Sequence, residues 1–148
     1  MTEKQQQSQQ IVKRYMWLSA GAGLIPVLYL DGAAVSGVQL KMIAEISKLY
    51  EVPFQENLGK AAIASLAGFI IPHAAAIGAL SAAVPGLSVV GAPLAAAFAG
   101  AYSWAMGNMF IQHFESGGTF LDLKPERLRE HFKSLFESGQ KTVPPLEA

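Results

Sequence analysis

Few residues in this sequence combine a reactive type with a spacing that suggests chemistry. Asp31 follows an apolar run, and an acid at membrane depth marks an ion path, a proton site or a partner. The simpler interpretation is a helix cap, because its carboxylate can accept free backbone N–H groups. His73 directly follows Pro72, so it either bonds a carbonyl freed by a proline kink or lines a polar path through a bilayer. His113, beside an aromatic residue and an acid, is most simply an interfacial residue.

Motifs for catalysis and cofactor binding are missing from the sequence. It contains no Gly-x-x-x-x-Gly-Lys-Ser/Thr loop for nucleotide phosphates, and Gly21-Ala22-Gly23 lacks the third glycine of a dinucleotide fingerprint. The three histidines are far apart without metal-ligand spacing, and there is no cysteine. No nucleophile, base and acid stand in a recognisable order. We therefore predict a protein that is not an enzyme and has no cofactor and no metal.

The composition indicates a membrane protein. Hydrophobic residues make up 51% of the 148 positions and charged residues only 15%, below the ~25% of ordinary soluble domains. The formal net charge is zero, so no excess of basic residues attracts nucleic acid. We predict one domain with no nucleic-acid partner.

A segment without charge lies at the centre of the chain. Residues 61–114 contain no Asp, Glu, Lys or Arg. A bilayer core of ~30 Å needs about 20 helical residues, so this segment is long enough to cross twice. Pro85-Gly86 can turn the chain between the crossings. The sequence therefore predicts an all-α fold built on a membrane helical hairpin, with arms at about 58–83 and 93–113.

Small residues recur four apart in the second arm of this hairpin. One series is Ala92, Ala96 and Gly100, and another is Ala99, Ser103 and Gly107. Such faces let helices approach closely in lipid, and they favour packing within a homo-oligomer. An Ala-rich sequence also produces these spacings by chance, and the two interpretations stand equal.

Three segments of different composition precede the hairpin. Residues 1–10 are rich in Gln and predict a disordered polar tail. Residues 15–30 are apolar but short for a span, so they predict a re-entrant element or a helix buried against the hairpin. Residues 32–51 have the spacing of an amphipathic helix, which we expect at the membrane surface or against a partner.

A second amphipathic helix follows the hairpin. Pro125 suits a first helical turn, and Gly139 is expected to end the helix. The apolar stripe consists of Leu128, Phe132, Leu135 and Phe136. Residues 11–139 then form a single helical membrane domain, and residues 140–148 a disordered tail.

The basic residues predict the topology. Lysines precede the hairpin and a group of lysines and arginines follows it, while its turn is uncharged. Basic residues mark the cytoplasmic side, so both termini are expected in the cytoplasm and the hairpin in the bacterial inner membrane.

Two stretches carry a resemblance to a known family. They are Ile25-Pro26 … Asp31 … Gln39-Leu40-Lys41-Met42-Ile43 … Leu49-Tyr50 with Val52-Pro53-Phe54, and Gly107-Asn108 … His113-Phe114-Glu115-Ser116-Gly117-Gly118-Thr119. Over about residues 12–138 the chain resembles the YcjF-like bacterial membrane domain of unknown function. Asp31, Gln39, Met42 and Tyr50 match that family's pattern, whereas Glu51 stands where the pattern leads us to expect Gly.

The resemblance implies a partner more than an activity. Such domains occur as the membrane part of, or are encoded beside, Era-like and dynamin-like GTPases, some of them linked with envelope stress. It therefore implies a separate P-loop GTPase as a partner and attaches no catalytic role to the matching residues.

Three functions compete at this point. The first is a non-enzymatic membrane scaffold that self-associates and recruits a cytoplasmic partner, for which the resemblance implies a small GTPase. The second is an oligomeric channel or pore with Asp31 or His73 facing inward. The third is a membrane-shaping protein that inserts the hairpin as a wedge. A soluble helical assembly that buries the apolar stretches between subunits also stays open.

Overall fold

The computed structural model describes residues 2–23, 32–66 and 88–142. These residues form helices and connecting turns, with no strand among them. The elements are α1 (Glu3–Gly23), α3 (Gly32–Leu49), α5 (Ser88–Glu115), the 3-10 helix η1 (Phe120–Asp122) and α6 (Pro125–Thr142), and residues 56–66 are helical as well. The prediction of an all-α fold is confirmed for this part of the chain.

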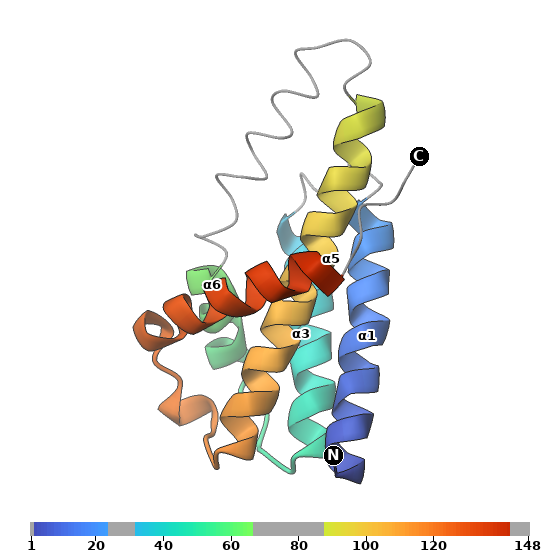
Figure 1. Ribbon diagram of the computed structural model, residues 1–148. Helices are drawn as coiled ribbons and strands as arrows, with labels where there is room; N and C mark the ends of the chain where they lie inside the picture. Colours follow the sequence, from blue (N-terminus) through green and yellow to red (C-terminus); the bar gives the residue numbers. More distant parts are fainter. Residues whose placement is uncertain (1, 24–31, 67–87, 143–148) are drawn as a thin grey trace.

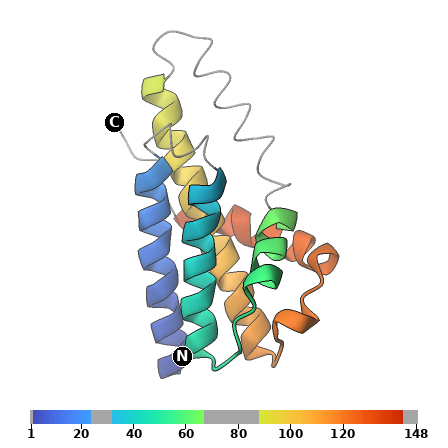
Figure 2. The same cartoon turned by 180° about the vertical axis from the view of Figure 1, so that it is seen from behind.

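Helices α1, α3 and α5 lie side by side, and α6 crosses α5 (Figures 1 and 2). Their directions follow from interhelical hydrogen bonds, which join Gln9 to Asn108, Ser19 to Ser103, Gln39 to Ser103 and Tyr50 to Glu115. Helix α1 is therefore antiparallel to α5, and α3 is parallel to it. The N-terminal turns of α5 extend beyond the ends of α1 and α3 (Figure 1).

Apolar side chains from all of these helices meet in one core. The largest fully buried apolar side chains are Val12, Met42, Ile43, Ile46, Leu66, Met106, Met109, Phe110, Phe120 and Phe132. Full burial of one such side chain stabilises the fold by about 1.5–3 kcal/mol. Because the set includes Leu66, Phe120 and Phe132, the core also holds residues 56–66, η1 and α6 against the three-helix bundle.

The amphipathic stripe of α3 packs inside the chain. Met42, Ile43 and Ile46 are fully buried in the core that α1 and α5 share with α3. The expectation that this helix lies at a membrane surface or against a partner is therefore wrong for its apolar face. The spacing is that of any helix with one buried side, and it does not specify what covers that side.

The predicted disordered tail at residues 1–10 is also wrong, because α1 begins at Glu3. The backbone N–H of Gln5 donates to Thr2 Oγ1 at 3.2 Å, and the N–H of Thr2 donates to Gln5 Oε1 at 2.9 Å. This reciprocal pair caps the first turn. Farther along, Ser8 is buried and Gln9 bonds to α5 across 2.7 Å, so the polar residues of this segment belong to a packed helix.

Helix α6 begins at Pro125 as predicted, and its stripe packs on α5. Phe132, Leu135 and Phe136 are buried, and Leu128 packs partly buried against the core. The helix continues past Gly139, where we expected its end, to Thr142. A Cβ at Gly139 would lie 2.9 Å from the Ala101 carbonyl oxygen, so the glycine lets α6 approach the backbone of α5. Residues 143–148 lie outside the described residues.

Helices α3 and α5 end in the same hydrogen-bonded turn. After α3, the N–H of Val52 donates to the Ser47 carbonyl and that of Glu51 to the Lys48 carbonyl. After α5, Gly118 and Gly117 donate to carbonyls at the equivalent positions. This Schellman arrangement places one residue in the left-handed region, where φ is +57° for Glu51 and +86° for Gly117.

The described residues cover only parts of the predicted hairpin. Residues 56–66 hold the start of the first arm, and the rest of that arm lies outside the description, as does the turn up to residue 87. Helix α5 contains the second arm and begins at Ser88, earlier than the expected 93. Within residues 2–23, 32–66 and 88–142, no helix has both the length and the apolarity required to cross a membrane. The membrane hairpin stays a prediction.

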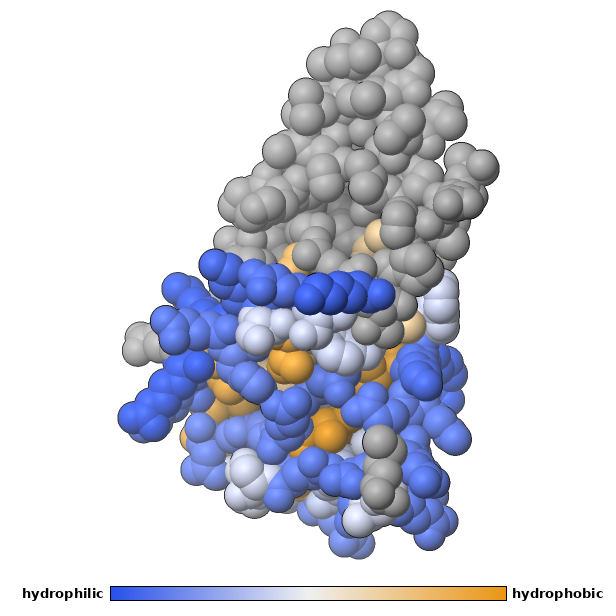
Figure 3. Space-filling model, viewed as in Figure 1, coloured by the Kyte–Doolittle hydropathy of each residue, from blue (hydrophilic) through white to orange (hydrophobic). Residues whose placement is uncertain are grey.

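The helix directions place the charged residues at one end of the bundle. Residues 15–23 of α1, 32–40 of α3 and 88–114 of α5 contain no charged side chain. Because α1 runs opposite to α3, the stretches of these two helices share one end, which we call the charge-free end; α5 is uncharged along almost its whole length and begins at that end. On the face seen in Figure 3, hydrophilic residues cover α6 and the charged end of the bundle, which is the end opposite to the charge-free end. Apolar residues show mainly between the helices.

Candidate functional site

A buried row of polar side chains joins the three long helices. Gln39 Nε2 of α3 donates to Ser103 Oγ of α5 at 2.5 Å, and Ser103 Oγ donates to Ser19 Oγ of α1 at 2.6 Å. All three residues are buried. A polar group away from water costs free energy unless it is hydrogen-bonded, so the row fixes how the helices align. Gln39 Oε1 is buried without a hydrogen-bond partner among the described residues.

The family-pattern residues in α3 and directly after it lie along the contact with α5. Gln39 bonds to Ser103, Met42 lies beside Gly107, and the Tyr50 hydroxyl donates to Glu115 Oε1 at 2.8 Å. The Tyr50 ring also lies 6.2 Å from that of Phe114, measured between centroids. The two stretches that carry the resemblance therefore meet in space along this contact, where they hold two parallel helices in register.

Gly107 lets α5 lie close to both α1 and α3. A Cβ there would lie 2.5 Å from Val12 Cγ2 and 3.3 Å from Met42 Sδ. Gly100 and Ser103 are buried as well. Part of the small-residue face thus packs within one chain. The side chains of Ala92 and Ala96 in α5 are outside the description, and so are Asp31 and His73.

A polar cluster connects α1 to the charged end of α3. The Tyr15 hydroxyl donates to Glu45 Oε1 at 2.6 Å, and Arg14 forms an ion pair with the same carboxylate. Burial, followed by the hydrogen bond to Glu45, raises the pKa of Tyr15 to about 12. Burial likewise raises the pKa of Tyr50, although its hydrogen bond to Ser8 opposes the rise. Both phenols are therefore neutral hydrogen-bond donors at physiological pH.

The loop after α5 is held by His113. Its Nε2 donates to the Thr119 carbonyl at 2.8 Å, and a Cβ at Gly118 would lie 2.5 Å from the imidazole ring. Thr119 and Asp122 then cap η1 with a reciprocal pair of hydrogen bonds. His113 is half-buried and fastens this turn, a role more specific than the interfacial position expected from its neighbours.

A shallow groove of about 400 Å³ lies beside this loop. It is lined by His113, Leu121, Asp122, Lys124, Arg127 and Leu128. The Leu121 side chain is 79% exposed, far more than any other large apolar residue in the described part of the chain. An exposed leucine beside two cations is suited to contact with another macromolecule. The sequence contains no periodic signal for Leu121, because its exposure depends on how η1 projects from the bundle.

The described residues contain no group of three or more His, Asp or Glu side chains that could hold a metal ion. The polar residues that the fold brings together carry hydroxyl, amide and phenol groups, joined by the Glu45 and Glu115 carboxylates and the Arg14 guanidinium. Their observed hydrogen bonds run between helices, so their evident effect is to position those helices.

Comparison with known proteins places this architecture in a family. The chain matches the model of DUF697, a domain of unknown function, over residues 1–141. It is also 35% identical over 140 residues to magnetosome membrane protein 22 of Magnetospirillum gryphiswaldense, a match that covers 90% of this chain and 70% of that relative. No solved structure matches it significantly. The resemblance to a membrane domain of unknown function is thereby confirmed at the level of the family, and the chain belongs to the DUF697 family.

Proposed function

We propose that the chain is a non-enzymatic scaffold of the bacterial inner membrane that self-associates and recruits a small GTPase to its cytoplasmic, charged end. The membrane association is supported by the likeness to a magnetosome membrane protein. The GTPase partner comes from the resemblance in the sequence. The predicted hairpin anchors the domain, and both termini lie in the cytoplasm.

The observation that carries this proposal is the separation of charge along the bundle. Helices α1, α3 and α5 each bring an uncharged stretch to the same end, although those stretches lie far apart in the sequence. Charged side chains are costly in a bilayer and favourable in water. A bundle with one charge-free end and one charged end therefore fits a position across a membrane surface, with the charge-free end in lipid.

Extraction of membranes from expressing cells tests the membrane part of the proposal. We expect the protein to resist alkaline carbonate and to dissolve only in detergent, as a species larger than one chain. Release by carbonate alone would refute the anchor and favour a soluble helical assembly. Ion flux through reconstituted vesicles, or their deformation by the pure protein, would favour the pore or the membrane-shaping alternative.

The recruitment of a partner is tested at Leu121, which with Lys124 and Arg127 forms an exposed surface at the charged end. We expect a purified Era-like GTPase from the same organism to sediment with vesicles that carry the protein. Leu121→Ser should weaken this binding, because it removes an exposed apolar contact. Leu58→Ser makes the same change at another exposed leucine and is the matched control. Equal binding by both variants would contradict a role for the Leu121 surface.

A further inference from the structure

Helix α6 crosses the bundle at the boundary between the charge-free and charged ends. Gly139 lies against Ala101 of α5, and the rings of Phe132 and Tyr102 are 5.5 Å apart between centroids. Thirteen uncharged residues of α5, 88–100, lie beyond this crossing. At ~1.5 Å per residue they extend about 20 Å, so α5 enters a bilayer core of ~30 Å without crossing it. This placement leaves residues 101–113 of the predicted second arm outside the lipid.

An exposed tryptophan lies at the same level on α1. Ser19 bonds to Ser103, which sets the height of α1 against the crossing point of α6. Trp17 is two residues away, about 3 Å along the helix axis. Its side chain is 50% exposed. Tryptophan in such a position is typical of the interface between lipid and water.

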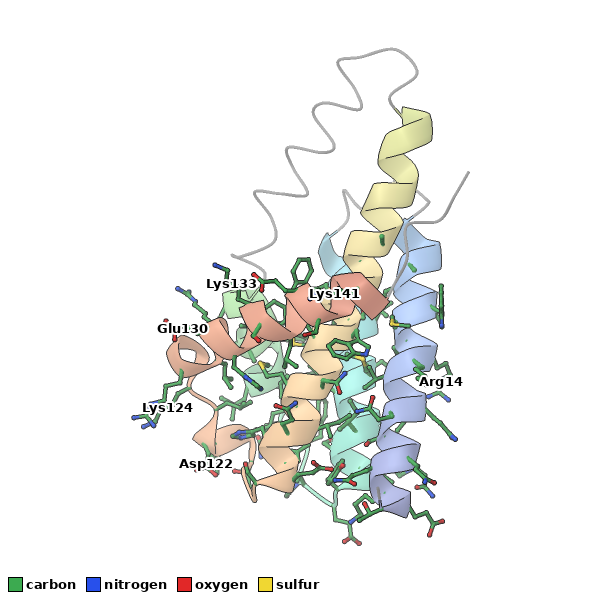
Figure 4. All side chains as sticks on the ribbon, in the orientation of Figure 1. Arg14, Asp122, Lys124, Glu130, Lys133 and Lys141 are labelled. Carbon is green, nitrogen blue, oxygen red and sulfur yellow. The ribbon has the colours of Figure 1, made fainter. Side chains whose placement is uncertain are left out.

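The orientation of α6 directs two cations towards the charge-free end. His131 Nε2 bonds to Gln112 Oε1 at 2.5 Å, and Gln112 lies on the charged-end side of the crossing, so His131 marks that edge of α6. Arg129 and Lys133 are each two residues from His131, which is about 200° around the helix. They therefore share the opposite edge, and Figure 4 shows Lys133 on that side of α6.

These two cations have exposed side chains and no ion-pair partner among the described ones. They are one helical turn apart, at the level of Trp17. We propose that α6 lies at the headgroup level of an anionic bilayer and that Arg129 and Lys133 bind lipid phosphates there. This inference rests on the proposed membrane location of the charge-free end, and it adds the lipid class and the residues that recognise it.

Depth measurements test the placement. Because the chain has no cysteine, single cysteines can carry a spin label in the full-length protein, reconstituted in vesicles of phosphatidylcholine with one third phosphatidylglycerol. Ala97→Cys reports the charge-free end of α5, about 6 Å beyond Ala101, Ser134→Cys reports α6, and Gln7→Cys reports the charged end. Ser134 and Gln7 are exposed in the structure, and Ala97 is partly exposed.

We expect the label at Ala97 to collide with oxygen in the hydrocarbon, that at Ser134 to lie at headgroup depth, and that at Gln7 to lie in water. A label at Ala97 in hydrocarbon with one at Ser134 in water would overturn the inference about α6 and leave the proposed membrane location standing. A label at Ala97 in water would overturn both.

Lipid selectivity tests the two cations. Basic residues near an anionic surface favour anionic lipid by about fivefold each. We expect Arg129→Gln with Lys133→Gln to abolish the preference of spin-labelled phosphatidylglycerol over phosphatidylcholine for the protein. Lys124→Gln with Arg127→Gln removes the same charge from the groove beside η1, and it should retain the preference. Retained selectivity in the first pair, or equal loss in both, would overturn the assignment to Arg129 and Lys133.

Discussion

The matching turns after α3 and α5 predict opposite effects of substitution at two equivalent positions. A residue with a Cβ in the left-handed region costs roughly 1–2 kcal/mol, whereas glycine pays no such steric cost. Glycine also has more freedom in the unfolded chain, which offsets about 0.4–1 kcal/mol of that gain. Glu51→Gly should therefore raise the free energy of unfolding by about 1 kcal/mol, although it only deletes atoms.

The structure isolates this backbone effect. Glu51 is exposed, and no hydrogen bond or ion pair of its side chain is found among the described residues. At Gly117 a Cβ would meet no atom within 4 Å, so Gly117→Ala tests strain without a clash. We expect that variant to lose about 1 kcal/mol, the mirror image of Glu51→Gly.

Thermal unfolding in a mild detergent, followed by circular dichroism at 222 nm, measures both changes. A difference of 1 kcal/mol moves the midpoint by about 2–4 °C for a chain of this size. Glu51→Ala is the control, because it removes the carboxylate but keeps the Cβ, and it should leave the midpoint nearly unchanged. If Glu51→Gly were no more stable than Glu51→Ala, the strain argument would be refuted.

Three further predictions concern contacts between helices. Gly107→Ala should destabilise the fold by about 1–3 kcal/mol, because its Cβ overlaps with Val12. Adding Val12→Ala should recover part of this loss in the same melting experiments. If the double variant recovered no stability, the strain would lie at another contact. Ser103→Ala should cost about 1–3 kcal/mol, because it leaves the buried Gln39 amide without its acceptor. A loss below about 0.5 kcal/mol would contradict the role of the polar row. Tyr15 has a folded pKa of about 12, above its unfolded value of 10.0, so its contribution to stability is complete below pH ~10 and is lost as the pH rises towards 12. Tyr15→Phe should make the melting midpoint fall less steeply over that window, and an unchanged slope would argue against the shift.

Much of the local structure could be predicted from the sequence. The start of α6 at Pro125 and its stripe of Phe132, Leu135 and Phe136 follow from rules that act within a few residues. The two stretches of the family pattern can also be recognised in the sequence as separate segments. Their meeting, as in the bond from Tyr50 to Glu115, depends on helix directions that no local pattern encodes.

The errors have a common physical cause. The Gln-rich start suggests a tail, because its apolar content is low, yet Gln9 and Val12 find partners on a helix almost a hundred positions away. The stripe of α3 likewise indicates a buried side without saying whether protein or lipid covers it. The exposed Leu121 could not be anticipated, since it depends on the path of a three-residue helix. Tertiary contacts decide all of these cases.

The contacts of α1 also set an order of assembly during synthesis. The ion pair between Arg14 and Glu45 joins residues 31 positions apart, whereas the bond from Gln9 to Asn108 spans 99 positions. Ribosomes add roughly 5–20 residues per second, so α1 and α3 can pair on the order of ten seconds before α5 is complete. During that interval the side of the pair that later receives Gly107, including Val12 and Met42, has no α5 to cover it. The nascent chain therefore has a defined period in which an apolar surface must be shielded by a chaperone or by the bilayer itself.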